Sequence, residues 1–467
     1  MITSNMVPSC GMARISSSLT RPKLFTTYDN DRIVKSHVYS IFVQSPGVFN
    51  MFNVIDKSIH RTRRRIVGQV VHERSMRIFE PTMMEQVDIY VTLLRESCQG
   101  PDPKPINMTD RTTFLACDII AMLAFGYPMK LQTDPENRFI VEGMLSANYI
   151  ASYRMQCYRL HQARFFDIKQ FLDTPKLKRY WSLMVKIIMT RTAEDDNVRH
   201  DLFSVVADSN KQAVDPGDGI RAGEVWSEAV SFFPAGAFST SGGICAAFFY
   251  LSRNRRCYEK LANEIRTTFA SSAEIQTGPL LSSCQYLRAC IDETLRLAPP
   301  VPGTLWREVP HDNDKSEPVI IDGHVVPPGT QVGVSIYTLH HNEEYFPDPF
   351  AFKPERWLPS ETPKAQLKAM HEAFTPFSIG YRGCAGKAMA YLESNLVLAK
   401  TIWELDFKPA HGKLGEVGGG IAGKSNGRGL PDEYQLYDIV SGDHDGPYLV
   451  FSPRAEPEKN LNMKHDD

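Results

Sequence analysis

A stretch of 24 residues without a charged side chain, residues 229–252, lies in the middle of this 467-residue chain and limits the folds open to it. About 20 apolar residues suffice for a helix that spans a bilayer, so the stretch is either a membrane span or a helix buried in a large domain. It contains Pro234, Gly236 and a group of serine and threonine residues. Polar side chains in its middle suit a helix that faces an internal cavity better than one that faces lipid. We therefore expect a buried central helix.

The remaining hydrophobic pattern predicts a mainly helical chain. Apolar residues recur at helical spacing in residues 111–126, 177–194, 222–270 with a break near Pro234, 285–298 and 385–404. Strand-like runs lie on both sides of a Pro-Gly turn in residues 319–339, and a hairpin is expected in residues 434–454. No internal repeat and no long linker separates these segments. We expect one mainly α domain with small β-sheets.

Charge and cysteine content narrow the classes of partner and site. The chain has 52 lysines and arginines against 54 acidic residues, so its net charge of -2 gives no reason to expect nucleic acid as a partner. The basic cluster "HRTRRR", residues 60–65, is weak evidence on a chain this close to neutral. Its nine cysteines are scattered and form no C-x-x-C pair, which favours reduced thiols over disulfides or a zinc site.

Residues 1–36 are interpreted as a variable N-terminal segment, followed by one domain over residues 37–467. The first residues lack the apolar region of a signal peptide or membrane anchor, so no anchor is expected there.

A glycine-rich stretch raises a different class of function. "GGGIAGKS", residues 418–425, fits the phosphate-loop pattern G-x-x-x-x-G-K-[ST]. That chemistry needs a strand before the glycines and a helix after them, whereas glycines and a proline follow here. A surface insertion is the preferred interpretation, and a phosphate-loop nucleotide-binding protein remains the rival from another class.

A second motif surrounds one cysteine. In "FSIGYRGCAG", residues 377–386, Cys384 lies in a turn with three glycines and an arginine, just before a predicted helix. Upstream, Glu293 and Arg296 are three residues apart and therefore on one face of their helix. Arg356 follows in "FKPERW". This series resembles the ExxR helix, the PERW segment and the F-x-x-G-x-R-x-C-x-G signature of the cytochrome P450 family. The sequence around these motifs is most similar to fungal microsomal members.

The resemblance implies the cytochrome P450 fold, with a single haem-containing domain over residues 37–467 and haem b as cofactor. Cys384 would be the axial thiolate ligand of the iron, and its place before a helix N-terminus would lower the thiol pKa. Phe377 would shield the sulfur, and Gly386 would let the backbone approach the porphyrin closely.

The resemblance also assigns charged residues around the haem. Arg382, Arg307 and the pair His60 and Arg64 would bind the propionates. Glu293, Arg296 and Arg356 would form a buried ionic network behind the haem. The other arginines of the basic cluster, Arg61, Arg63 and Arg65, would lie near the face where a flavoprotein reductase docks.

The central helix departs from the family pattern. Members usually carry an acid followed by a hydroxyl residue, which together deliver protons during oxygen activation, but here Phe238 stands at the acid position and Ser239 and Thr240 follow. Ser239 and Thr240 are therefore the candidate catalytic residues. By family position, the substrate pocket would be lined by Phe232, Phe233, Phe238, Thr304 and Leu305. Each of these aromatic side chains could equally be simple core packing.

The chain is interpreted as a haem-thiolate monooxygenase that oxidises an apolar organic substrate with electrons from NADPH through a flavoprotein reductase. Fungal resemblance suggests a tailoring step in secondary metabolism on a terpenoid, polyketide or indole skeleton. Because the acid is missing, an isomerase or dehydratase of the same fold that needs no reductase remains an alternative. The resemblance implies the cytosolic face of the endoplasmic reticulum, although the chain as written lacks the N-terminal anchor.

Overall fold

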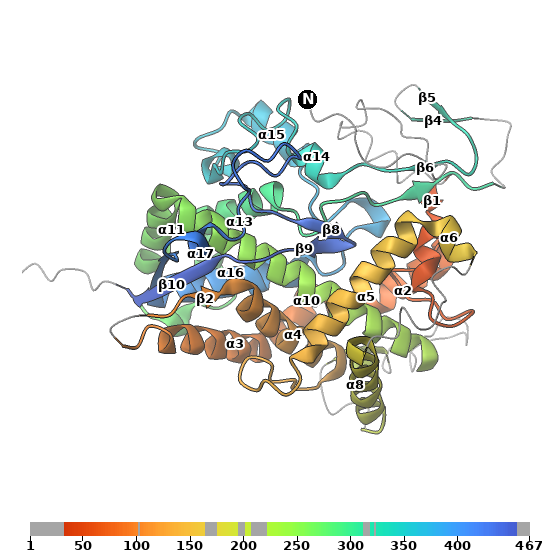
Figure 1. Cartoon of the computed structure of the whole chain (residues 1–467), viewed down its shortest axis with the longest axis horizontal. Coiled ribbons are helices and arrows are strands. Elements are labelled where there is room, and N and C mark those ends of the chain that lie inside the picture. Colours follow the sequence, from red (N-terminus) through yellow and green to blue (C-terminus); the bar gives the residue numbers. More distant parts are fainter. Residues whose placement is uncertain are drawn as a thin grey trace, which may run out of the picture.

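Helix α10 (Ala222–Arg253) crosses the middle of the molecule, and the other long helices pack around it (Figure 1). The computed structural model describes residues 32–100, 103–163, 175–194, 201–206, 222–311, 318–321 and 324–454. Within these ranges α10 is the one helix long and apolar enough to cross a membrane by length and composition, and 67% of its apolar window is buried. The charge-free stretch thus forms a helix that is covered by the rest of the protein.

The predicted break at Pro234 is wrong, because α10 continues through this residue. Proline removes one hydrogen bond from a helix interior and costs about 3 kcal/mol, so packing must compensate. The next turn supplies it: Gly236 faces helix α4 (Met108–Phe125), and a Cβ on Gly236 would lie 2.6 Å from Ile120. The chain instead breaks at Asn254, and helix α11 (Arg255–Thr268) follows.

Three of the remaining longer helices follow predicted segments: α8 (Pro175–Thr192), α13 (Gln285–Leu297) and α16 (Lys387–Glu404). Four others lie outside the segments named from the sequence: α2 (Lys57–Val67), α3 (Glu73–Glu96), α5 (Phe139–Gln156) and α15 (Lys364–Ala373). Short α-helices are α6 (Tyr158–Gln162), α12 (Pro279–Ser283), α14 (Ile336–His340) and α17 (Lys413–Glu416). Short 3-10 helices are η1 (His37–Phe42), η2 (Gly68–Val70), η5 (Ser272–Glu274), η6 (Pro354–Trp357) and η7 (Gly380–Arg382).

The strands are short and form small antiparallel sheets. One sheet has the order β1-β3-β6, from Val34–Lys35, Arg307–Glu308 and Gln331–Val332. A second has the order β2-β10-β7, from Ile106–Asn107, Tyr448–Pro453 and Leu405–Pro409. Two hairpins pair β4 (Val319–Ile321) with β5 (His324–Val326) and β8 (Tyr437–Ile439) with β9 (Ser441–Asp443). Residues 336–339, expected as strand, belong to helix α14 (Ile336–His340), which begins where Ser335 caps the amide of Thr338.

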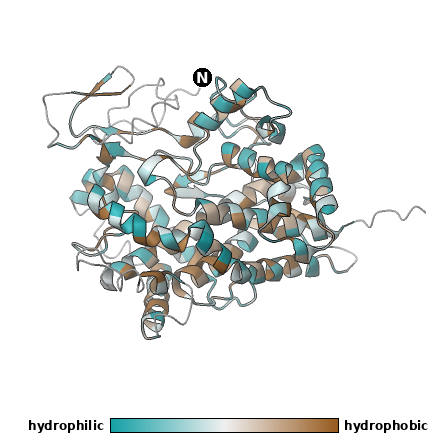
Figure 2. Ribbon diagram, turned by 180° about the vertical axis from the view of Figure 1, so that it is seen from behind, coloured by the Kyte–Doolittle hydropathy of each residue, from teal (hydrophilic) through white to brown (hydrophobic). Residues whose placement is uncertain are grey.

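Two hydrophobic cores hold these elements. The main core joins the inner faces of α3, α4, α8, α10, α11, α13 and α16. The second lies where β3 to β6 meet α14 and η6. Figure 2 shows that hydrophobic residues (brown) and hydrophilic residues (teal) alternate along the helix ribbons. This pattern supports the predicted fold class, mainly α with small sheets.

The glycine-rich stretch is a loop on the surface. Gly418–Ser425 follows the four-residue helix α17 and not a strand, and no helix occurs between residues 421 and 436. Its backbone folds back on itself, since the Ile421 amide donates to the Arg428 carbonyl at 2.8 Å. The geometry of a phosphate loop is therefore absent from this part of the chain.

Residues 1–31 of the predicted N-terminal segment lie outside the described residues.

Candidate active site

The cysteine turn is held by backbone hydrogen bonds in front of α16. The Cys384 amide donates to the Phe377 carbonyl at 2.7 Å, and the Gly383 amide donates to the Gly380 carbonyl at 3.0 Å. Gly380 has φ +70°, a conformation that glycine adopts without strain. A Cβ on Gly386 would lie 3.8 Å from the Cys384 sulfur, so the backbone passes close to the thiol. The turn therefore presents the sulfur at the N-terminal end of a long helix.

The Cys384 thiol is exposed, yet the protein around it is dense enough to affect its ionisation. Burial raises its pKa, while a hydrogen bond from the Gly386 amide and the charges of Arg64 and Lys387 lower it without reversing the shift. The sequence predicted a lowered pKa for this thiol, but in the protein alone the pKa is raised. The cause is desolvation, whose effect on the pKa is larger than that of the amide and the charges at the helix N-terminus. An accessible thiol within dense surroundings suits a ligand position, since a bound metal cation deprotonates a coordinating thiol outright.

Basic side chains from distant parts of the sequence surround this turn. Arg382 donates to the carbonyls of Val54 and Ile55 at 2.6 and 2.8 Å. Arg64 on α2 donates to the carbonyls of Gly383 and Cys384. His60 lies one turn earlier on α2, Arg307 lies on β3, and both are buried.

Lys35, which the sequence did not predict, belongs to the same cluster. It pairs with Arg307 across strands β1 and β3, and its ammonium lies 4.1 Å from the ring centroids of Tyr39 and Phe52. Burial, followed by the charges of Arg307 and Arg382, lowers its pKa well below the usual range. No motif marks Lys35, and only its pairing with Arg307 reveals it.

The cluster carries more positive charge than its surroundings neutralise. Burial lowers the pKa of His60 to about 3, and the charges of Arg382, Lys35, Arg64 and Arg307 add to the shift. Mutual lowering of this kind requires cations close together in a low-dielectric region. The arrangement suits a ligand that carries carboxylates.

The ExxR pair and the PERW arginine meet in one buried network. Glu293 accepts from Arg296 at 2.9 Å on each carboxylate oxygen, and from Arg356 at 3.0 Å. Trp357 and the Lys353 amide also donate to Glu293 at 3.0 Å. Burial opposes ionisation of Glu293, but the charge and hydrogen bonds of Arg296 and then Arg356 outweigh it and lower its pKa. The network ties α13 to η6.

The central helix presents a mixed face at the predicted pocket. Ser239 is half-exposed and its hydroxyl donates to the Ala235 carbonyl at 2.6 Å, whereas Thr240 is buried. Phe232 and Phe238 are half-buried against the main core. Phe233 is different, because it is fully buried and packs against Phe125 with ring centroids 5.8 Å apart. The prediction that Phe233 lines the pocket is therefore wrong, since this ring belongs to the core.

Comparison with known proteins gives this geometry a family. The family model described as Cytochrome P450 matches residues 22–416. The chain belongs to the cytochrome P450 family. It is 33% identical to "Cytochrome P450 monooxygenase apf7" of Gibberella fujikuroi over 91% of this chain and 81% of that protein. It is also 33% identical to "Cytochrome P450 monooxygenase AKT7" of Alternaria alternata, over 90% and 80%.

A solved structure extends the likeness to the fold. The "Crystal structure of cytochrome P450DA heme domain" superposes with a TM-score of 0.72 at 18% identity, covering 93% of this chain and 87% of that one. This P450 chain therefore has the P450 fold and, by its relatives, is a P450 monooxygenase. Family membership implies haem, and the residues present fit it. An accessible thiol at a helix N-terminus lies beside a cationic cluster whose charge two propionates would reduce.

Two of the remaining predicted positions lie after the ExxR helix. Thr304 and Leu305 are half-buried, and Thr304 bridges to Ser335 while Leu305 packs on the second core.

Of the three additional arginines, Arg61 and Arg65 are exposed, but Arg63 is buried in an ion pair with Glu224 at the start of α10. The expectation that Arg63 faces a docking reductase is therefore wrong, since helical spacing turns it inward.

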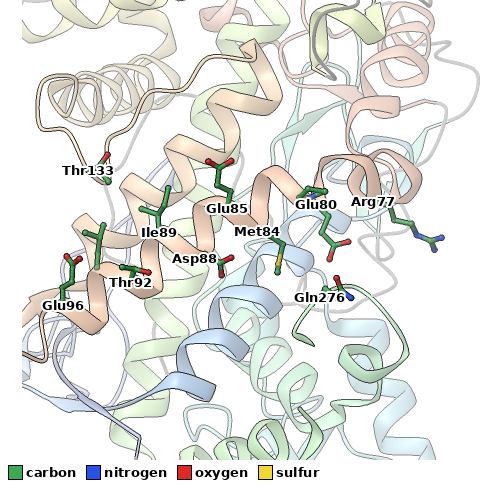
Figure 3. Close-up of a pocket in the computed structure, with 12 residues that line it drawn as sticks. Arg77, Glu80, Met84, Glu85, Asp88, Ile89, Thr92, Glu96, Thr133 and Gln276 are labelled. Atoms are coloured by element: carbon green, nitrogen blue, oxygen red, sulfur yellow. The ribbon is translucent and has the colours of Figure 1, made fainter. Parts of the chain in front are cut away.

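The outside of this P450 has a basic recess and an acidic groove. The recess, of about 670 Å³, borders the cysteine turn, with Arg64, Arg77, Arg288 and Lys387 among its lining residues. The groove, of about 880 Å³, runs along α3, and Glu80, Glu85, Asp88 and Glu96 are among its lining residues (Figure 3). The groove on α3 is lined by none of the residues of the cysteine turn. Of the two, the basic recess therefore borders the candidate active site at Cys384, and the acidic groove does not.

Proposed function

We propose that this P450 monooxygenase uses a haem-thiolate centre to oxidise an apolar organic substrate, in which Cys384 would supply the thiolate that binds the iron. One oxygen atom of O2 would enter the substrate and the other would leave as water, with two electrons from NADPH and two protons. The observation that supports this most is the Cys384 thiol, which is accessible within dense surroundings and lies beside an unneutralised cationic cluster. The haem would supply the activation of O2, which amino-acid side chains cannot perform.

The same proposal assigns the residues that would hold the cofactor. Arg382, Arg307, His60 and Arg64 would bind the propionates, joined by Lys35. Guanidinium groups suit this task because their fork of donors matches a carboxylate. His60, whose pKa is lowered to about 3 by burial and then by the neighbouring cations, would donate a ring N–H hydrogen bond to a propionate. Phe377 and Gly386 would enclose the sulfur.

Proton delivery would rest on a water held by the hydroxyl of Ser239. Phe238 cannot donate a proton, and Thr240 is buried, so Ser239 Oγ is the remaining half-exposed hydroxyl of the predicted triplet. Its proton is committed to the Ala235 carbonyl, which leaves its lone pairs free to accept from water. We expect Ser239→Ala to raise the share of NADPH electrons that leave as peroxide, measured with reductase present. An unchanged share would place the proton path elsewhere.

Electrons would enter through the basic recess. Arg64, Arg77, Arg288 and Lys387 line it beside the cysteine turn, and Arg61 and Arg65 are exposed on α2, which bears Arg64. Such a surface attracts and orients an acidic partner, here the flavoprotein NADPH–cytochrome reductase. Its resemblance to fungal microsomal members of the family supports a location at the cytosolic face of the endoplasmic reticulum. The fungal relatives support a tailoring role in secondary metabolism, on a terpenoid, polyketide or indole skeleton.

The test of this function is the carbon monoxide difference spectrum of the reduced protein. Thiolate ligation gives a red-shifted Soret band, and Cys384→Ala should abolish it. Cys290→Ala and Cys245→Ala serve as matched controls, because both thiols are fully buried in the core and should leave the band intact. A normal band from the Cys384 variant would remove the basis of the proposal.

A further inference from the structure

Asp438 belongs to the hairpin β8–β9, which lies above α10 (Figure 1). The hairpin packs against α10 and α5. The Gly442 amide donates to the Pro300 carbonyl at 2.7 Å, and Tyr149 on α5 donates to Asp443 at 2.7 Å. The hairpin is thus tied to the chain that follows the ExxR helix on one side and to α5 on the other.

The carboxyl group of Asp438 lies directly against Gly303. A Cβ on Gly303 would overlap the carboxylate oxygen Oδ2, so the carboxyl occupies the space that any side chain at 303 would take. The next residues along the chain are Thr304 and Leu305, which family position assigns to the substrate pocket. An acid therefore lies at the edge of a pocket that is otherwise expected to be apolar.

This carboxyl group is accessible and yet closely surrounded, as the Cys384 thiol is. Asp438 is exposed, but burial raises its pKa, and its charge also raises the pKa of the buried Tyr39. It accepts a hydrogen bond from the Val440 amide at a long 3.4 Å. No lysine or arginine among the described residues pairs with it within 4.0 Å. A closely surrounded carboxylate with so little compensation is costly to cover with an apolar ligand.

We propose that Asp438 is the polar anchor of the substrate pocket and accepts a hydrogen bond from an N–H or O–H group of the substrate. The inference rests on the proposed monooxygenase function and narrows its substrate class. The substrate is an apolar skeleton that carries a hydrogen-bond donor, and a skeleton without one is rejected. Rejection follows because such a ligand would displace water from the carboxylate and leave it unpaired.

The test compares the affinities of paired aromatic compounds of similar size for the ferric holoenzyme. Each compound is titrated into the enzyme, and binding is followed by the shift of the Soret band. Indole and benzothiophene differ in an N–H group, and 1-naphthol and naphthalene differ in an O–H group, so the two pairs separate the sources of the donor. A hydrogen bond to a charged group is worth about 10-fold or more in affinity. Asp438→Ala should therefore weaken indole, 1-naphthol or both by about 10-fold or more, and should not weaken benzothiophene or naphthalene.

Two further variants separate anchoring from folding. Gly303→Ala keeps the acid but displaces its carboxyl, and it should reduce the preference for donors as Asp438→Ala does. Asp438→Asn keeps an acceptor oxygen and should retain part of the preference. Asp432→Ala is the matched control, because Asp432 is exposed on the loop before the hairpin. This control should bind all four compounds as the parent does.

The outcomes are distinguishable from failure of the proposed function. If the parent protein shows no red-shifted carbon monoxide band, the monooxygenase proposal fails first. If the band is normal and Asp438→Ala weakens donor and non-donor compounds equally, only the anchor is refuted. If no compound binds the parent, benzothiophene should still bind Asp438→Ala, because the unpaired carboxylate has been removed. Absence of that gain would also refute the anchor.

Discussion

The carboxylate of Glu293 shows how a single buried charge is made stable. Both of its oxygens accept from Arg296, and the remaining positions accept from Arg356, Trp357 and the Lys353 amide. Buried charges are tolerated only when geometry and hydrogen bonding are this complete. The arginines in turn donate to the carbonyl of His340 at the end of α14 and to carbonyls between residues 347 and 351, so the network also holds the irregular segment after α14.

Glu293→Ala should therefore destabilise the protein by about 3–5 kcal/mol, because it leaves two arginines without their counter-ion. Denaturant unfolding of the holoprotein measures the loss. Glu259→Ala is the control, since Glu259 forms an exposed i,i+4 pair with Arg255 and such pairs are worth about 0–1 kcal/mol. Equal losses in the two variants would contradict a structural role for the network.

The same network predicts sensitivity to acid. The folded-state pKa of Glu293 lies below its ordinary value, because the arginines outweigh the effect of burial. Its stabilisation is therefore fully present above the ordinary glutamate pKa and is lost as the pH falls through the lower folded-state value.

At the residue scale, motif residues were predictable and isolated ones were not. The fixed spacing of the motifs is enough to identify four residues from the amino-acid sequence alone: Cys384, Glu293, Arg296 and Arg356. Lys35 and Asp438 belong to no motif, because their roles arise from contacts with Arg307 and Gly303 that only the folded chain creates.

Among the elements, α10 shows how packing overrides local helix propensity. It runs through Pro234, which helix propensity alone disfavours, and two residues later it packs closely on α4, since a Cβ on Gly236 would lie 2.6 Å from Ile120. The pattern of the sequence predicted the helix but not its continuity. Propensity is a local property, whereas the compensation at Gly236 comes from a side chain more than a hundred residues away.

Gly236→Ala should destabilise the protein by about 1–3 kcal/mol, because the new methyl group would overlap Ile120. Gly223→Ala, near the start of the same helix, meets nothing within 4 Å and tests helix propensity alone. This control should be neutral or stabilising by up to about 1 kcal/mol. Thermal unfolding of the two variants measures the contrast, and a stabilised Gly236 variant would show that the two helices can move apart.

Helix α16 illustrates a second limit of pattern reading. Met389, Leu396 and Ala399 are buried on one face as its periodicity predicts, but Glu393 and Lys400 are buried as well. Lys400 pairs with Asp88 of α3, while burial raises the pKa of Glu393 to about 8. A helix packed on several sides can bury polar residues, and a single apolar stripe does not reveal this.

At the scale of the whole molecule, the fold gathers cationic and basic groups that are far apart in sequence. Lys35 comes from β1, His60 and Arg64 from α2, Arg307 from β3, and Arg382 from the cysteine turn. Each of the four lysine and arginine side chains lowers the pKa of at least one other group in the cluster, so the protein stores repulsion there. A dianionic cofactor would relieve this repulsion and thereby stabilise the entire chain.

Haem dimethyl ester isolates this contribution, because it keeps the porphyrin and the iron but lacks the negative charges of the propionates. Added to the apoprotein, haem should raise the thermal unfolding midpoint more than its ester does, since charge-assisted hydrogen bonds are worth about 1.5–3 kcal/mol each. Lys35→Met should reduce the difference between the two cofactors by removing one cation. Lys424→Met, on the exposed glycine-rich loop, should leave the difference unchanged. Equal stabilisation by haem and ester would mean that the cationic cluster does not bind the propionates.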